Sequence, residues 1–310
     1  MDASSEVLNG LRCRHCGDCR AAMKEIRIRA GDGHTLVLVR SGCVQGPVVA
    51  ITHGTFSGTA SCDRLGAYLA AQGFGTWLFD WRGHGRNPAC GHGHDLEAVA
   101  RHDIASAIEA IRSEEQGRPL TLIGHSGGGI AAAIWAARNP DLARDHLAGV
   151  VLLAAQATHA AATPLAWARI RGYLAWIGRR NWLAANRMVG PEAESGQLMR
   201  QWCQWNLQRR FVGHDGMNYL QALSQVRIPV LALAGAGDRL IAPWQGCEAL
   251  ASAFGGTDVE FVLCGKAAGF VEDYSHSRLL MAGNAQSDVF PRIAQWIRLR
   301  AEQGGQALVS

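Results

Sequence analysis

The chain has 310 residues, of which 48% are apolar and 18% charged, and its formal net charge is +4. This length and composition are enough for a substantial core and argue against extended disorder. The chain contains no run of 18 apolar residues, so we expect no transmembrane helix. The charge is mild and no basic–aromatic motif occurs, which predicts that nucleic acid is not a partner.

The cysteines and the first residues bear on the cellular compartment. There are nine cysteines, and residues 1–22 contain charges but no apolar segment typical of a secretory signal. We therefore expect reduced thiols in a cytoplasmic protein. Cys13, Cys16 and Cys19 lie near His15, but a structural zinc site needs about four ligands and no second Cys-x2-Cys pair follows. We predict a flexible tail over residues 1–22 and no metal site.

From residue 23 onward, strand-like and helix-like segments alternate. Lys24–Ala30 and Thr35–Arg40 alternate in polarity around a Gly-Asp-Gly turn and predict a hairpin. Seven elements are expected next: a buried strand at Val48–Thr52, a helix at Cys62–Gln72, a strand at Gly75–Asp80, a helix at Val99–Ser113, a strand at Leu120–Ile123, a helix at Gly127–Arg138 and a strand at Leu147–Ala154.

The alternation stops near residue 160. Residues 160–222 contain no convincing strand but five tryptophans, and the rhythm returns with strands at Ile228–Ala234 and Val259–Leu263 and a helix at Ala285–Arg300. Such alternation predicts an α/β fold with a mostly parallel sheet flanked by helices. We divide the chain into a core of 23–159 and 223–310 and a helical cap or lid of 160–222.

One short motif carries the expected chemistry. Gly124–Gly128 matches G-x-S-x-G, between the β-type run Pro119–Ile123 and the alanine-rich helical run Ile130–Arg138. A serine on such a strand-to-helix turn projects its hydroxyl above the sheet, and the flanking glycines leave room for backbone and substrate. The helix N-terminus also favours developing negative charge. We predict Ser126 as a nucleophile.

A serine nucleophile needs a base, and the base needs an orienting carboxylate. In this topology the expected order along the chain is Ser, then Asp or Glu, then His. Asp238 follows the strand Ile228–Ala234, and His276 is the only histidine after it. We predict His276 as the general base and Asp238 as its orienting acid, with Asp273 as the weaker candidate.

The oxyanion formed during acyl transfer needs hydrogen-bond donors. Gly127 follows the nucleophile and offers its backbone N–H. The second donor is expected in the loop after Val48–Thr52, where Thr55 is the first choice and Phe56 the reserve.

The remaining histidines are expected to have supporting roles. We expect His53 and His84 to be scaffold residues and His125 to pack under the nucleophile turn. His92 and His94 are expected in a solvated loop.

These segments together resemble the α/β-hydrolase fold superfamily over roughly residues 24–302, and within it the lipase-like serine hydrolases. The matching segments, in order, are His53-Gly54, residues 80–85 (Asp-Trp-Arg-Gly-His-Gly), residues 124–128, Gly237-Asp238 and His276. The resemblance implies triad roles for Ser126, Asp238 and His276. Residues 273–278 depart from the Asp-Tyr-Gly-His-Leu-Asp found in these hydrolases, which leaves the subfamily and the substrate open.

The segment 160–222 supplies the candidate substrate pocket. Trp167, Trp202 and Trp205 are either lid core or pocket wall, and Phe56 is a further pocket candidate. Residues 161–212 contain eight arginines against Glu192 and Glu194, which form either a solvated face or a surface for an anionic partner.

The predicted function is cofactor-independent hydrolysis of a small-molecule ester or thioester with an apolar portion, through an acyl-enzyme. Two alternatives stay open: an acyltransferase or C–C bond hydrolase with the same triad, and a non-catalytic ligand-binding relative. The serine in the motif disfavours an aspartate nucleophile, and no dinucleotide G-x-G-x-x-G follows the first buried strand. The sequence does not indicate an oligomeric state.

Overall fold

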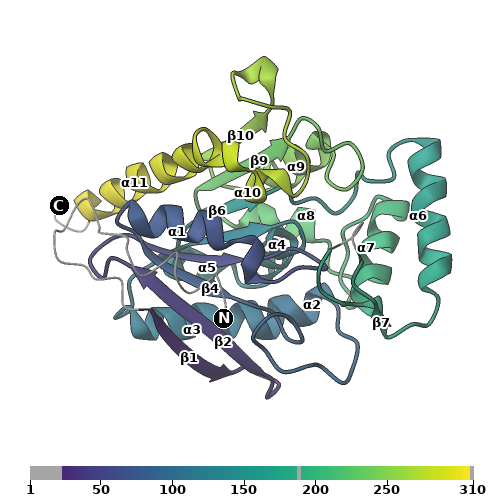
Figure 1. The fold of residues 1–310 in the computed structure, drawn as a ribbon, viewed down its shortest axis with the longest axis horizontal. Coiled ribbons are helices and arrows are strands. Elements are labelled where there is room, and N and C mark those ends of the chain that lie inside the picture. The colour runs from purple at the N-terminus through teal and green to yellow at the C-terminus, as the bar shows by residue number, and fades with distance from the viewer. Residues whose placement is uncertain (1–22, 187–189, 308–310) are drawn as a thin grey trace.

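A computed structural model describes residues 23–186 and 190–307 of the chain, and an eight-stranded sheet runs through its centre (Figure 1). The strand order is β1-β2-β4-β3-β5-β6-β9-β10. The strands are β1 (Lys24–Arg29), β2 (Thr35–Gly42), β3 (Val48–Thr52), β4 (Gly75–Phe79), β5 (Leu120–His125), β6 (Leu147–Leu153), β9 (Val230–Gly235) and β10 (Val259–Cys264). β2 is antiparallel to β1 and β4, and all other neighbours are parallel. The expected mostly parallel sheet is confirmed.

Helices cover both faces of this sheet (Figure 1). One face is covered by α1 (Asp63–Ala71), α10 (Arg278–Met281) and α11 (Val289–Ala307). The other face is covered by α2 (Leu96–Ala98), α3 (Ala105–Glu114), α4 (Gly127–Arg138), α5 (Pro140–His146) and α8 (Tyr219–Ala222). A further helix, α9 (Trp244–Ala251), packs against β9 and β10.

The apolar run of β3 shows why the sheet is buried on both sides. Val48 and Ala50 belong to the core under α3 and α4, whereas Val49 and Ile51 belong to the core under α1 and α11. Successive side chains of a strand point to opposite faces, so a strand covered on both sides has no position that faces solvent. This arrangement places the carboxyl ends of β3, β4, β5, β6 and β9 along one edge, from which the functional loops emerge.

Two helical features differ from the sequence expectation. In place of one continuous helix over Val99–Ser113, the chain forms α2, a π-helical segment (Val99–Ile104) and α3. Buried Asp103 in that segment pairs with Arg82 at 2.6 Å, a tertiary contact that periodicity cannot reveal. In addition, α4 ends at Arg138 as predicted, but a helix that was not predicted, α5, begins at Pro140, because proline is compatible with the first helical position.

The segment between β6 and β9 forms an insertion at one end of the sheet (Figure 1). Its helices α6 (Pro164–Ile177) and α7 (Gly196–Gln208) pack against each other. The expectation that it contains no strand is wrong, because β7 (Trp182–Leu183) pairs with β8 (Glu194–Ser195). Strands of two residues are too short to produce a period-2 pattern.

The outer edge of the sheet is formed by β1, whose side chains alternate between solvent and the sheet. Its polar residues Lys24, Glu25, Arg27 and Arg29 are exposed, and its two isoleucines are half-buried against the core. This pattern confirms the alternating strand that the sequence predicts.

Two further expectations concern the membrane and the N-terminus. Over the ranges 23–186 and 190–307, no helix has both the length and the apolar character needed to cross a bilayer. The expected tail and its residues Cys13, Cys16 and Cys19 lie outside the described residues.

Candidate active site

Ser126 occupies the turn between β5 and α4 in a strained backbone conformation. Its φ and ψ are 51° and −117°, outside the regions that a non-glycine residue normally adopts. The turn depends on two glycines: a Cβ on Gly124 would lie 2.5 Å from the carbonyl carbon of Gly128, and one on Gly128 would lie 2.4 Å from the carbonyl oxygen of His53. The flanking glycines therefore permit the close approach that presents the Ser126 side chain.

His276 lies between Ser126 and Asp238. Its Nε2 is 2.9 Å from Ser126 Oγ, and its Nδ1 is 2.5 Å from Asp238 Oδ2. The other carboxylate oxygen of Asp238 accepts hydrogen bonds from the backbone N–H groups of Ile241 and Ala242, both at 3.1 Å. The carboxylate thus holds the proton on Nδ1, which leaves the lone pair of Nε2 directed at the serine hydroxyl.

The charge of Asp238 is also favoured by its surroundings. Burial alone would raise the pKa of Asp238, but the hydrogen bond and charge of His276 and the two backbone N–H groups hold it below its usual range. Asp273, the weaker candidate, is exposed and accepts the Lys266 N–H at 2.9 Å. The structure therefore brings Asp238, and not Asp273, to His276.

His125 supports the same histidine from the other side. Its Nε2 donates to the carbonyl oxygen of His276 at 3.1 Å, and the two ring centroids are 4.9 Å apart. Burial lowers the pKa of His125 to about 3, so its ring is neutral and carries its proton on Nε2. The sequence places His125 under the turn, but nothing in the sequence indicates this contact with a residue 151 positions away.

The two predicted oxyanion donors lie beside each other. A Cβ on Gly127 would be 3.5 Å from the backbone nitrogen of Thr55 and 3.0 Å from its Cγ2. Within the described part of the chain, neither of these N–H groups donates a hydrogen bond. The reserve candidate, Phe56, instead donates its N–H to Glu194 Oε2 at 3.1 Å. This leaves Thr55 and Gly127 as the available pair.

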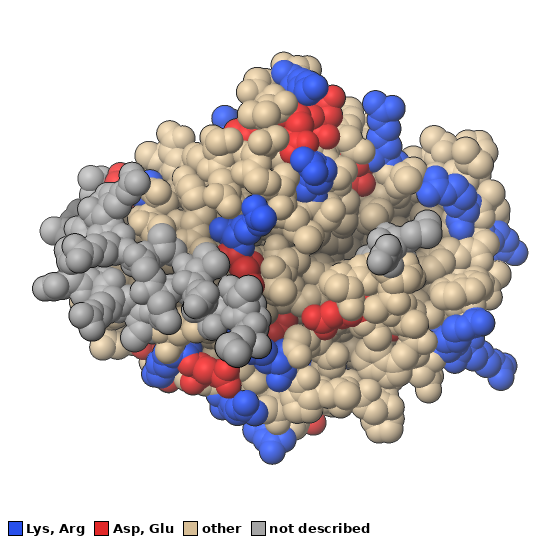
Figure 2. All heavy atoms as spheres, viewed as in Figure 1, with Lys and Arg blue, Asp and Glu red and all other residues tan. Residues whose placement is uncertain are grey.

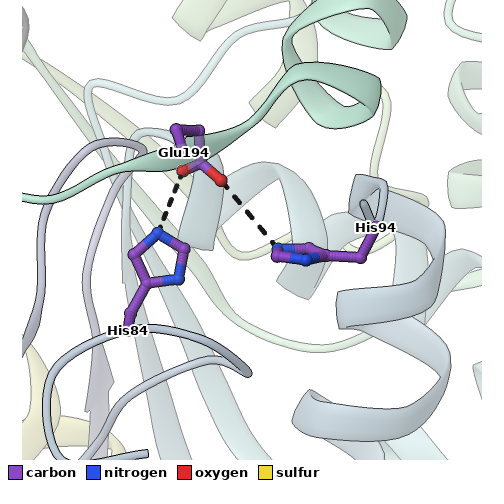
Figure 3. A group of neighbouring side chains, drawn as sticks. All are labelled: His84, His94 and Glu194. Carbon is purple, nitrogen blue, oxygen red and sulfur yellow. Dashed lines mark ion pairs between the residues drawn. The ribbon is translucent and has the colours of Figure 1, made fainter. Parts of the chain in front are cut away.

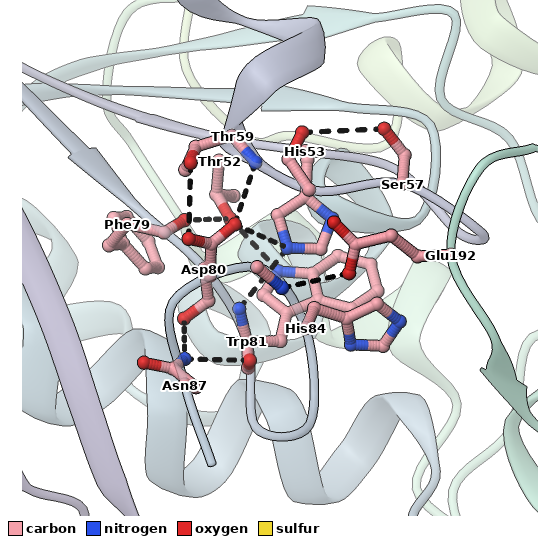
Figure 4. Close-up of polar contacts among 12 residues, drawn as sticks. Thr52, His53, Ser57, Thr59, Phe79, Asp80, Trp81, His84, Asn87 and Glu192 are labelled. Carbon is pink, nitrogen blue, oxygen red and sulfur yellow. Dashed lines mark hydrogen bonds and ion pairs between the residues drawn. The ribbon is translucent and has the colours of Figure 1, made fainter. Parts of the chain in front are cut away.

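The loop after β3, which contains Thr55 and Phe56, is called the oxyanion loop below. A buried network joins it to the loop after β4 (Figure 4). Asp80 accepts the Thr59 N–H at 2.6 Å, and the Trp81 indole donates to Thr52 Oγ1 at 2.9 Å. His53 accepts the Trp81 N–H at Nε2 (3.2 Å) and donates from Nδ1 to the adjacent Gly54 carbonyl (2.8 Å). Burial lowers the pKa of His53 to about 3, so the ring is neutral. His53 thus has the scaffold position expected for it.

The insertion contacts these loops directly. Glu192 accepts the Gly85 N–H at 2.8 Å, and its own N–H donates to the Phe56 carbonyl at 3.1 Å. Ser195 Oγ accepts the His94 N–H at 2.9 Å, and His94 is only 4% exposed. His92 is exposed, as expected, but the solvated position expected for His94 is wrong, because β8 covers it.

The predicted pocket residues occupy different environments. Phe56 and Trp205 are both 4% exposed, and the Trp205 indole donates to the Val212 carbonyl at 2.8 Å. Trp202 is half-buried against the core, and Trp167 is 41% exposed with Arg171 over its ring. Of the described arginines in 161–212, all but Arg200 are exposed. Figure 2 shows Lys and Arg side chains along the side where Figure 1 places α6.

Within residues 23–186 and 190–307, two groups of side chains have donor atoms close enough together to hold a metal ion. One is buried His84, His94 and Glu194, and the other is Asp95, Glu97 and exposed His214. In the second group the acidic residues already have protein partners, since Asp95 caps α2 and Glu97 pairs with Arg138. The sequence predicts neither group as a metal site, because in each group one member, Glu194 or His214, lies about a hundred positions from the other two.

Comparison with known proteins places this geometry in context. The model of the family described as serine aminopeptidase, S33, matches residues 45–268. The chain is 30% identical over 108 residues to protein phosphatase methylesterase 1 of Candida albicans, and 31% identical over 109 residues to the bifunctional esterase/perhydrolase DCH of Acinetobacter calcoaceticus. Each match covers 35% of this chain, and only 29% and 37% of the respective relatives.

Solved structures show the same fold at low identity. A soluble variant of monoglyceride lipase from Saccharomyces cerevisiae is 19% identical with a TM-score of 0.67, covering 90% of this chain and 96% of that one. A thermophilic esterase from Thermogutta terrifontis is also 19% identical, with a TM-score of 0.64 and coverage of 89% and 99%. At these identities the likeness shows the fold alone.

Proposed function

The chain belongs to the serine aminopeptidase S33 family of α/β-hydrolases, and from this premise we propose that it hydrolyses a carboxylic ester or thioester through an acyl-enzyme. The observation that carries the proposal is the chain of contacts from Ser126 Oγ through His276 to Asp238, at 2.9 and 2.5 Å. These contacts support the proposal, because acyl transfer requires a nucleophile, a base and an orienting acid within hydrogen-bond reach of one another.

In the acylation step, Ser126 Oγ attacks the substrate carbonyl while His276 Nε2 removes the hydroxyl proton. The Asp238 carboxylate stabilises the imidazolium that forms. The carbonyl oxygen becomes an oxyanion and accepts hydrogen bonds from the N–H groups of Thr55 and Gly127. When the tetrahedral intermediate collapses, the bond to the alcohol or thiol breaks, and His276 returns the proton to the leaving group.

Deacylation repeats this sequence with water as the nucleophile. His276 Nε2 removes a proton from water, which attacks the acyl carbon attached to Ser126. The same two N–H groups hold the second oxyanion. Its collapse releases the carboxylic acid, and His276 returns the proton to Ser126 Oγ, so the enzyme is regenerated.

The apolar specificity is assigned to the segment 160–222, which we treat as a lid. Glu192 donates its N–H to the Phe56 carbonyl and Glu194 accepts the Phe56 N–H, so the segment is fastened to the loop after β3, at the end of the sheet where Ser126 lies. Phe56, Trp167 and Trp202 are the proposed wall for the apolar portion of the substrate. Trp205, with its indole bonded inside the lid, is proposed to maintain the shape of that wall.

The direct test is a panel of p-nitrophenyl esters of increasing chain length, with labelling by a fluorophosphonate probe. Wild type should hydrolyse the esters and become labelled. Ser126→Ala should lose label and lower kcat by about 10⁴-fold or more. Ser252→Ala, at an exposed serine after α9, is the matched control and should behave as wild type. Turnover retained by Ser126→Ala would refute the mechanism, and an unlabelled, inactive wild type would favour a binding protein.

Transfer to an acceptor other than water is the second candidate, because one relative is a bifunctional esterase/perhydrolase. The acyl-enzyme would then be attacked by an alcohol or by hydrogen peroxide in place of water. Product analysis with a competing alcohol separates the two outcomes: hydrolysis predicts mainly free acid, whereas a transferase predicts mainly the new ester.

We further propose that the protein acts in a reducing compartment such as the cytoplasm. Cys62, Cys90, Cys203, Cys247 and Cys264 are buried thiols without disulfide partners. Such thiols are typical of proteins that fold in a reducing environment.

A further inference from the structure

Three side chains from distant segments converge between the core and the lid (Figure 3). His84 lies in the loop after β4, His94 lies just before α2, and Glu194 belongs to β8. His84 Nε2 is 3.4 Å from one carboxylate oxygen of Glu194, and His94 Nε2 is 3.9 Å from the other. All three side chains are at most 3% exposed, so water does not solvate them as it would surface groups.

Three of the four ring nitrogens in this group lack hydrogen-bond partners among the described residues. His84 donates from Nδ1 to the Arg82 carbonyl at 3.1 Å, and its Nε2 faces Glu194 without a hydrogen bond to it. In His94, neither nitrogen has a partner among the described residues. A buried polar atom without a partner costs free energy, so an arrangement with three such atoms in one place requires an explanation.

Glu194 is itself held in place by backbone donors. One of its oxygens accepts the Ser195 N–H at 2.7 Å, and the other accepts the Phe56 N–H at 3.1 Å. Each oxygen retains a lone pair, so the carboxylate presents acceptors to both histidines. Acceptors that face one another at these distances are stabilised when a positive charge lies between them.

From this geometry we propose that His84, His94 and Glu194 bind one zinc ion, with a water molecule as the fourth ligand that tetrahedral zinc needs. Two imidazole nitrogens and a carboxylate form a ligand set typical of Zn²⁺, whereas Ca²⁺ and Mg²⁺ prefer oxygen ligands. Bond lengths of about 2.0–2.2 Å in a tetrahedral site place ligand atoms about 3.3–3.5 Å apart. The His84–Glu194 separation of 3.4 Å lies in this range, the His94–Glu194 separation of 3.9 Å is longer, and the three donor atoms all lie within 4.8 Å of one another.

The surroundings of His84 match those of a metal ligand. Metal-bound histidines generally donate their second ring N–H to a carbonyl or carboxylate, which fixes the tautomer and orients the ring. The bond from His84 Nδ1 to the Arg82 carbonyl has this form. Burial alone would lower the pKa of His84, but the charge of Glu194 raises it to about 9, and a second proton on its Nε2 would pair with that carboxylate. Both nitrogens of His94 would still lack a hydrogen-bond partner among the described residues.

Zinc in this position would join the lid to the oxyanion loop. Glu194 belongs to the lid, both histidines belong to the core, and the same carboxylate accepts the Phe56 N–H next to Thr55. The ion therefore has a structural role: it fastens β8 against the loops that carry the proposed oxyanion donor. Its binding is measured without any substrate, so failure of the hydrolase assignment leaves it testable.

The experiment must separate this site from the N-terminal cysteines, which are potential thiolate ligands. The full-length protein with Cys13, Cys16 and Cys19 changed to serine is stripped with a chelator, re-equilibrated with Zn²⁺ and analysed for zinc per chain and for Tm. We expect one zinc per chain and a higher Tm with zinc. Loading with Co²⁺ should give the visible absorption of a tetrahedral site without a strong thiolate band.

Substitutions in this background identify the ligands. Glu194→Gln and His94→Phe should each weaken zinc binding by at least about tenfold. His92→Ala, an exposed neighbour of His94, and His214→Ala, from the second group, should keep the full zinc content. The proposal is overturned if the background protein takes up no zinc above buffer level, or if folded Glu194→Gln retains its zinc, with folding judged by circular dichroism.

Discussion

The Nε2–H of His125 donates to the main-chain carbonyl of His276 at 3.1 Å. The residue before the nucleophile therefore fixes the backbone of the residue that is proposed to act as its base. Ser126 and His276 are separated by 150 positions, so their alignment depends on tertiary contacts of this kind.

This contact makes His125 a positioning residue with a measurable effect on turnover. In His125→Phe the ring packing is kept, but the carbonyl of His276 loses its donor, at a cost of about 1–3 kcal/mol. We expect kcat to fall about tenfold or more while KM changes little. His125→Gln retains an N–H donor and should recover part of the rate. A lower Tm with unchanged kcat in His125→Phe would show that the contact is only structural.

The carboxylate opposite His276 offers a sharper test. Asp238→Asn removes the charge that holds the proton on Nδ1 of His276, so the wrong tautomer is favoured and kcat should fall by about 10³–10⁴-fold. Asp273→Asn is the matched control, since Asp273 bonds to the Lys266 N–H, and its kcat should remain within tenfold of wild type. Equal losses of kcat in the two variants, measured by steady-state kinetics, would contradict the assignment of Asp238 as the orienting acid.

Acid sensitivity of the fold should involve Asp32, in the turn between β1 and β2. Burial alone would raise the pKa of Asp32, but hydrogen bonds from Arg82 and His34 hold it well below its usual range. The folded state thus favours the charged form. This contribution to stability is fully present above the unfolded pKa, about 3.9, and is lost as the pH falls through the lower folded value.

Urea unfolding between pH 2 and 7 checks this expectation. The free energy of unfolding should decrease as the pH falls below about 4, and Asp32→Asn should show a shallower decrease. Asp141→Asn, which removes an exposed partner of Arg144, is the control and should follow the wild-type profile. An Asp32→Asn profile parallel to that of wild type would contradict the role of this ion pair.

The lid tryptophans should affect long substrates more than short ones. Trp167→Ala removes a proposed apolar wall, so kcat/KM for long-chain esters should fall about tenfold relative to acetate, as expected for the loss of 1–2 kcal/mol of apolar contact. Trp176→Ala is the control on the same helix, because Trp176 is 52% exposed and stacks on Tyr173. An equal loss for all chain lengths would place Trp167 outside the pocket.

The parts of the fold that the sequence predicts are those governed by local pattern. The buried strand Val48–Thr52 is recognisable because both of its faces are apolar, and the helix Gly127–Arg138 because a glycine-rich turn precedes it. Asp238 is a candidate because it follows the predicted strand Ile228–Ala234, and His276 because it is the only histidine after Asp238.

The parts that could not be predicted depend on contacts between distant segments. His94 reads as a loop residue because its cover, β8, lies a hundred positions away. Asp103 of the π-helical segment forms a buried ion pair with Arg82, and hydrophobic periodicity in the sequence cannot predict such a tertiary contact. Glu194 gives only a weak signal, as one of two acidic residues among many arginines, and its role depends on both histidines being brought to it.

The charged outer strand β1 affects the tendency of the protein to aggregate at high concentration. Its free backbone edge would template a strand from another molecule, and such pairing leads to fibrils or amorphous aggregates. Docking a foreign strand there would strip water from Lys24, Glu25 and the neighbouring arginines. Among the described residues no strand pairs with the outer side of β1, and its charged side chains therefore oppose self-association at this edge of the sheet.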